Sequence, residues 1–129
     1  MPWIAKGTLT LVPADISLIA FGRDSRRAVG TGDFPFGLLI QRPISAVRVT
    51  YRMLSADAGG STVVELRKNG VQLAGSRATI AAGSQLSSTV ITPGTAWSLV
   101  DGDVLTVYVV STGTNPGKGL IADVKAVCA

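Results

Sequence analysis

The stretch "VELRKNGVQL", residues 64–73, decides the fold expected for this chain. Apolar and polar residues alternate on both sides of an Asn-Gly pair, and this alternation is typical of β-strands with one buried face. A two-residue turn of type I′ requires positive φ at both central residues, and Asn followed by Gly adopts that conformation readily. The stretch therefore predicts a β-hairpin with Asn69 and Gly70 at its turn.

Further strands are predicted on both sides of this hairpin. Gly, Pro and Asn turns separate short apolar stretches that cover residues 38–41, 46–54, 62–68, 71–76, 78–85, 86–92, 104–112 and 120–127. In the stretch 46–54 the alternation places four side chains on the buried face: Val47, Val49, Tyr51 and Met53. Such strands, without a 3.6-residue periodicity, predict an all-β fold, an antiparallel β-sandwich that is jelly-roll-like.

The first 37 residues differ from the rest. "PADISLIAFG" (13–22) suggests one or two helical turns, because Pro13 and Asp15 suit a first turn. We interpret residues 1–37 as an N-terminal arm or cap and residues 38–129 as the β-sandwich domain. The arm carries large apolar residues and arginines of the types that are enriched at interface hot spots. The candidate protein-interface residues are Trp3, Ile4, Arg23, Arg26, Arg27, Phe34 and Phe36.

Few side chains suited to catalysis or metal binding are present. The chain has no histidine, so it lacks the commonest general acid or base and the commonest metal ligand. Cys128 is the only cysteine, and its position beside the C-terminus suggests a small buried hydrophobic residue. We therefore predict no enzyme activity, no catalytic or metal site and no cofactor.

Carboxylates offer only weak alternatives to this prediction. "DGD" (101–103) is the one close acidic pair in the sequence. Asp123 is a third acidic residue, which pairing of strands in a sheet could bring close to this pair. Calcium needs six to eight oxygen ligands, so a turn entering the next strand is the favoured interpretation. A glycosidase pair formed by Asp101 and Glu65 is conceivable, but nothing else in the sequence supports it.

The charge balance disfavours nucleic acid as a partner. The net charge is +4, and the densest basic cluster is "GRDSRR" (22–27) with only Phe21 close to it. Nucleic-acid binding proteins usually present a longer basic face interleaved with stacking aromatics. No apolar run approaches the ~20 residues of a membrane span, and the N-terminus lacks signal-peptide features. We expect no nucleic-acid or membrane partner.

The order of motifs from residue 46 to 127 resembles a known family. The motifs are "VELRKNGVQL", "TIAAGSQ", "TPGTAWSLVDGDVLTVYVV" and "GKGLIADVKA". Together they resemble the β-sandwich modules of tailed-bacteriophage virion proteins, which occur in minor tail proteins, tail and head fibres and capsid decoration proteins. Residues 1–45 carry no matching motif. The resemblance implies that the sandwich is a rigid scaffold that holds surfaces.

The function expected on this basis is that of a structural virion protein, made in the bacterial host cytoplasm and resident in the virion. A capsid decoration or stabilisation protein is the leading candidate, docked on the major capsid protein or another virion protein through its arm. Homo-oligomers, with trimers favoured, are expected, and so is a folded sandwich after deletion of residues 1–30. A minor tail or fibre protein is the alternative. A carbohydrate-binding module is a further alternative. It requires an aromatic platform, and within the sandwich only Trp97 and Tyr108 are available for one.

Overall fold

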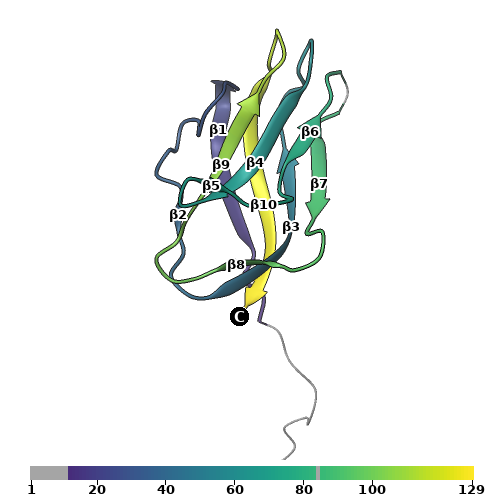
Figure 1. Cartoon of the computed structure of the whole chain (residues 1–129). Helices are drawn as coiled ribbons and strands as arrows, with labels where there is room; N and C mark the ends of the chain where they lie inside the picture. The colour runs from purple at the N-terminus through teal and green to yellow at the C-terminus, as the bar shows by residue number, and fades with distance from the viewer. Residues whose placement is uncertain (1–11, 84) are drawn as a thin grey trace, which may run out of the picture.

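The computed structural model describes residues 12–83 and 85–129, and the regular structure in these residues is entirely β-strand (Figure 1). One sheet has the order β1 (Ile16–Arg26), β10 (Lys118–Cys128), β3 (Ile44–Arg52) and β7 (Ser87–Ile91), and β8 (Trp97–Leu99) also pairs with β3. The other has the order β2 (Leu38–Leu39), β9 (Val104–Ser111), β4 (Thr62–Lys68) and β5 (Val71–Gln72), and β6 (Ala78–Ile80) also pairs with β4. All pairs are antiparallel, which confirms the all-β sandwich; the jelly-roll arrangement stays a prediction.

The core lies between the two sheets and consists mainly of aliphatic side chains. Every second residue of β9 is buried, namely Leu105, Val107 and Val109, as the period of two along a strand requires. Val49 and Tyr51 of β3 belong to the same hydrophobic cluster from the opposite sheet. Burial of each large apolar side chain contributes about 1.5–3 kcal/mol, so the sandwich is held chiefly by this layer.

The predicted hairpin is present between β4 and β5. Lys68 pairs with Val71, which leaves a two-residue loop. Asn69 has a φ of 52° and Gly70 a φ of 83°, so both central residues have the positive φ of a type I′ turn. Asn69 is the one non-glycine residue with positive φ among those that the structure describes. The turn prediction is confirmed.

The prediction for the buried face of residues 46–54 was wrong at Val47. Ala46 pairs with Ala126 and Arg48 with Lys125, so Val47 is an extra residue in a β-bulge. The bulge shifts the alternation by one position. As a result Ala46 and Val49 are both buried, and Val47 is exposed.

The prediction for residues 13–22 also needs correction, because a long strand replaces the expected helical turns. Residues 16–26 form β1, which pairs with β10 and contributes Leu18 and Phe21 to the core. They are therefore part of the sandwich and not of an arm or cap. β10 decides this outcome, because the backbone pairs that it offers to residues 16–19, 21 and 26 outweigh a local helical preference. The expected arm residues Trp3 and Ile4 lie outside the described residues.

The two lateral sides of the sandwich are closed differently. On the side of β5 and β6, the Tyr51 hydroxyl donates to the carbonyl of Ser76 at 2.7 Å. On the same side, the Trp97 indole donates to the carbonyl of Ala74 at 2.8 Å. The opposite side, where β1 faces β2 and β9, is covered by the connection of residues 27–37 (Figure 1). This second side carries the surface described next.

Candidate interaction surface

The connection between β1 and β2 is anchored to both sheets. Gly30 exchanges two backbone hydrogen bonds with Val109 of β9, at 3.0 and 2.9 Å. The amide of Asp33 donates to the carbonyl of Ala20 on β1 at 2.7 Å, and its side chain accepts from the amide of Gly22 at 2.9 Å. This bond lowers the pKa of the Asp33 carboxyl. The connection is therefore held in one conformation.

This anchored connection presents apolar side chains to solvent. Phe36 is 85% exposed and Phe34 is 50% exposed. Ile19 on β1 and Leu39 on β2 are also more than half exposed on the strands that flank the connection. Large apolar residues gathered on one side of a domain usually mark an interaction site, whereas single ones need no explanation.

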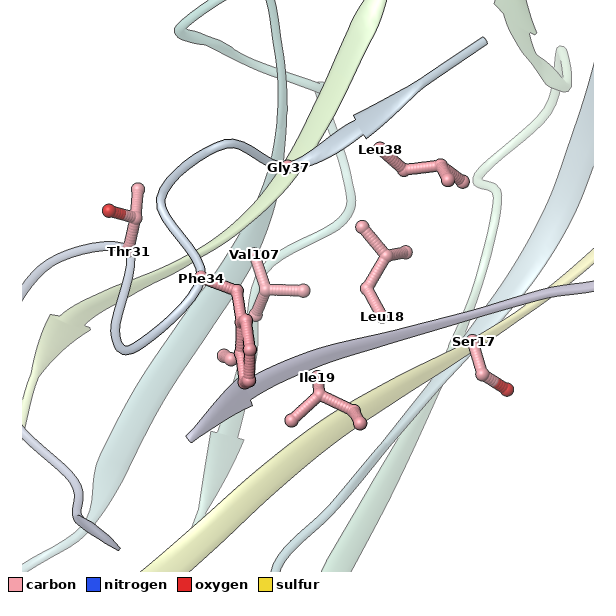
Figure 2. Close-up of a pocket in the computed structure, with 9 residues that line it drawn as sticks. Ser17, Leu18, Ile19, Thr31, Phe34, Gly37, Leu38 and Val107 are labelled. Atoms are coloured by element: carbon pink, nitrogen blue, oxygen red, sulfur yellow. The ribbon is translucent and has the colours of Figure 1, made fainter. Parts of the chain in front are cut away.

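A hollow of about 240 Å³ is lined by two of these residues, Ile19 and Phe34. Figure 2 shows Leu18 of β1 extending toward Leu38 of β2, with Phe34 from the connection beside Val107 of β9. The lining is mainly apolar, and its polar side chains are Ser17 and Thr31. Among the described residues no titratable side chain lines the hollow, so its lining suits an apolar group.

The arginines predicted at the interface have different environments. Arg23 and Arg26 are exposed at the end of β1, and Arg23 lies 3.8 Å from Asp24 with both side chains in solvent. The prediction for Arg27 was wrong, because its side chain is fully buried and paired within the chain. Its counterion is Asp57 of the same chain, at 2.7 Å. An isolated buried charge is costly, so the fold supplies the counterion.

Arg27 joins three segments at one end of the sandwich. One terminal nitrogen donates to the carbonyls of Lys118 and Gly119 at 2.8 and 2.7 Å. The other donates to the carbonyl of Ser55 at 2.8 Å and to Asp57 Oδ1 at 2.7 Å. Arg27 therefore connects the end of β1 to the β3–β4 connection and to the start of β10.

The Asp57 carboxylate accepts hydrogen bonds from three residues. Besides Arg27, the Thr62 hydroxyl donates to Oδ2 at 2.6 Å and the Gly117 amide donates to Oδ1 at 3.0 Å. Burial by itself raises the pKa of this carboxyl, but these hydrogen bonds and the charge of Arg27 outweigh it, and the pKa lies below its usual range. Asp57 is ionised at neutral pH, and its role is to hold the surrounding segments together.

The carboxylates that were considered for catalysis do not form an acid–base pair. Glu65 is buried and accepts hydrogen bonds from Arg67 at 2.8 Å and Arg77 at 2.7 Å. Asp123 is paired with Arg52 instead, and this contact lowers the pKa of Asp123. Asp101 is exposed in a turn. Within residues 12–83 and 85–129, no three acidic or cysteine side chains gather as a metal site would require.

The "DGD" sequence forms the turn that leads into β9. Asp103 Oδ2 accepts from the Val100 amide at 2.9 Å, and Oδ1 accepts from the Asn69 side chain at 2.9 Å. Asn69 in turn accepts from the Val104 amide at 2.9 Å. The hydrogen bonds that Asp103 accepts lower its pKa, and the bond from the Val100 amide has a larger effect than the bond from Asn69. The acidic residue of this turn thus connects it to the Asn69–Gly70 hairpin.

The aromatic pair required by a carbohydrate-binding module is not arranged as a platform. Trp97 is buried, on β8 of one sheet. Tyr108 lies on β9 of the other sheet, and the guanidinium of Arg67 covers its ring at 3.4 Å from the centroid. The described residues therefore present no sugar-stacking surface made from these two rings.

Sequence reasoning identified Phe34 and Phe36 in this surface but missed Ile19. The alternation in β1 is broken between Ile19 and Phe21, where Ala20 is an extra residue. The bulge buries Ala20 and Phe21 together, whereas Ile19 lies on the solvent face that it shares with Ser17. The polar Ser17, two positions earlier, is the local signal for this exposure.

No protein-family model matches the chain, and no curated protein matches it either. Among the described residues there is no helix long and apolar enough to cross a membrane.

Proposed function

We propose that this protein is a structural virion protein of a tailed bacteriophage, most consistent with a capsid decoration or stabilisation protein. The motif order from residue 46 to 127 resembles virion β-sandwich modules, and the fold is of the kind that the resemblance implies. In the described residues, the buried charged groups bond one another and the backbone, as Arg27 and Asp57 do. This use of charge favours a scaffold over an enzyme.

The observation that carries the proposal is the exposure of Phe34 and Phe36 on an anchored connection. An exposed aromatic ring on a connection that is already ordered loses little conformational freedom on binding, so it is well suited to be an interface anchor. The surface lies on the β1–β2 side, and the positively charged Arg23 and Arg26 are exposed farther along β1. Such charges favour an acidic partner surface and speed its encounter.

The proposed partner is the major capsid protein or another virion protein, and the proposed assembly is a homo-oligomer, most simply a trimer. Location in the virion follows from these partners. A minor tail or fibre protein is the same kind of scaffold at a different attachment point. The carbohydrate-binding alternative is less favoured because Trp97 and Tyr108 do not form a platform.

The test is a binding assay with purified capsids and purified tails of the phage that encodes the chain. We expect the full-length protein to co-sediment with capsids, and Phe36→Ser to weaken this binding about tenfold or more, which corresponds to ~1.4 kcal/mol. Val71→Ser is the matched control, because Val71 is 69% exposed on β5 at the other edge of its sheet.

The outcomes separate the alternatives. Binding to tails and not to capsids identifies a minor tail or fibre protein. Binding to neither particle contradicts the proposal. Equal loss in Phe36→Ser and Val71→Ser places the docking surface elsewhere. Thermal unfolding of both variants is expected to stay within about 0.5 kcal/mol of the parent, because both side chains are exposed.

Deletion of residues 1–30 cannot serve as this test. It removes β1, with core residues Leu18 and Phe21, and it removes Arg27 from the buried pair with Asp57. We now expect the truncated chain to lose the sandwich itself. Point substitutions on the surface are therefore required.

A further inference from the structure

The exposed side chain of Ile19 lies between two hollows at the edge of the sandwich. The first is the apolar hollow of about 240 Å³ between β1 and β2. The second has a volume of about 260 Å³. Its lining includes Arg23 of β1, Arg52 of β3 and the following Leu54. Ile19 lines both hollows, so they adjoin on the surface.

The two hollows differ in chemistry. The first is lined by Leu18, Phe34, Leu38 and Val107 and offers contacts for a bulky apolar side chain. The second contains two arginines. Arg52 is engaged by Asp123, whereas the ion pair that Arg23 forms within the described residues is a 3.8 Å contact with Asp24, with both side chains largely exposed. An ion pair this exposed contributes little, so Arg23 is available to a partner carboxylate.

The size of the first hollow argues for a side chain and against a small-molecule ligand. Sites for small molecules usually enclose about 300–1,000 Å³, and this hollow is smaller and open at the surface. The charge nearby argues against a second copy in a two-fold contact. In such a contact the two patches are identical, so each brings Arg23 and Arg26 and no additional carboxylate to pair with them.

We propose that the β1–β2 side binds a segment of another protein that carries a bulky aliphatic residue next to acidic residues. The aliphatic side chain enters the hollow over Leu18 and Leu38, the segment crosses Ile19, and a carboxylate pairs with Arg23. This inference rests on the proposed function, because it specifies the chemical groups that a partner presents to the docking surface proposed above. It names the kind of partner that the surface fits.

The test uses the full-length, ¹⁵N-labelled protein and two synthetic ten-residue peptides, which share a central leucine and are flanked by glutamates or by lysines. We expect the glutamate peptide to shift the amide signals of residues 17–20, 23 and 38, and to bind about two- to fivefold more tightly than the lysine peptide. Arg23→Glu should reverse this preference. Arg48→Glu is the control with the same change of charge, because Arg48 is exposed on β3 and lines neither hollow.

A second variant separates the apolar contribution from the electrostatic one. Ile19→Ser should weaken both peptides without changing their ratio, because it removes apolar surface that both hollows share. Equal binding of the two peptides, or shifts that map to another surface, would overturn the inference. So would self-association that removes the same signals, because the occupant would then be a second copy.

The inference and the proposed function fail in different ways. If the glutamate peptide does not bind but Phe36→Ser still weakens capsid binding, the docking role holds and the partner chemistry is wrong. If the peptide binds as expected but neither capsids nor tails bind the protein, the surface recognises acidic segments in another setting.

Discussion

The two ends of the sandwich both use a carboxylate to hold neighbouring connections together, but in opposite environments. At one end, Asp57 and Arg27 have no exposed side-chain surface. At the other, Asp103 and Asn69 form their hydrogen bond in solvent and join the hairpin to the turn before β9. The first end is thus a buried ionic network and the second an exposed polar one.

The difference shows how burial sets the cost of losing a partner. A buried charge whose counterion is removed stays out of water without compensation, which costs several kcal/mol. An exposed group that loses its partner is rehydrated, so its loss costs about 1 kcal/mol or less. The Arg27–Asp57 end should therefore tolerate substitution poorly, and the Asn69–Asp103 end well.

The largest effect is expected for Arg27→Met. This variant leaves the Asp57 carboxylate buried without its counterion and frees three carbonyl groups, so the free energy of unfolding should fall by about 3–5 kcal/mol. Urea denaturation followed by far-ultraviolet circular dichroism measures it. A fall below about 1 kcal/mol would show that the pair is solvated.

The double variant Arg27→Met/Asp57→Asn is the control for this effect. It removes both charges, so it should be more stable than Arg27→Met alone even though it carries one more substitution. Strict additivity of the two single changes would contradict a direct ionic interaction between these side chains.

A dependence on acid pH should follow from the same buried carboxylate. The pKa of Asp57 is lower in the folded protein than in the unfolded chain, where it is about 3.9. Its contribution to stability is therefore present above the unfolded pKa and is lost as pH falls through the folded pKa. Between pH 5 and pH 2, Asp57→Asn should lose less stability than the parent protein; an identical slope for the two proteins would sink this prediction.

A smaller effect is expected at the other end for Gly70→Val. The turn requires a φ of 83° at this position, where a β-branched residue is strained by about 1–3 kcal/mol. A Cβ at Gly70 meets nothing within 4 Å, so the cost comes from the backbone and not from a clash. Gly94→Val is the matched control, because Gly94 is equally open and lacks a positive φ. Equal melting temperatures of the two variants would contradict this explanation.

The smallest effect is expected for Asp103→Ala. Its partners, the Asn69 side chain and the Val100 amide, are exposed and can bond water instead. The free energy of unfolding should fall by about 1 kcal/mol or less. A loss as large as that in Arg27→Met would remove the contrast between the two ends.

Much of the fold could be predicted because its signals are local. The pattern of "TVVELRK" marks β4 and that of "VLTVYVVS" marks β9, and the Asn-Gly pair marks the turn, since each depends on neighbouring residues alone. The aromatic residues of the connection 27–37 were recognisable as interface candidates by their type. Their exposure was not, because it depends on what else packs there.

The errors arose where a distant strand decided the outcome. Val47 looks like a core residue in its local pattern, but a bulge in the pairing with β10 turns it to solvent. Residues 16–22 have mixed local preference and become a strand because β10 pairs with them. Arg27 looks like a surface arginine until the folded chain brings Asp57, thirty positions away, against it.

The sequence by itself determined that this protein is an antiparallel sandwich with a tight Asn69–Gly70 hairpin, because alternation and turn chemistry act between neighbouring residues. The tertiary structure alone decided which charges are buried and which apolar side chains remain in solvent. Both depend on strand register and on contacts between connections that are distant in sequence. No short stretch of sequence encodes the register or these contacts. The surface at Ile19 and Phe34 and the buried Arg27–Asp57 pair are two results of that assembly.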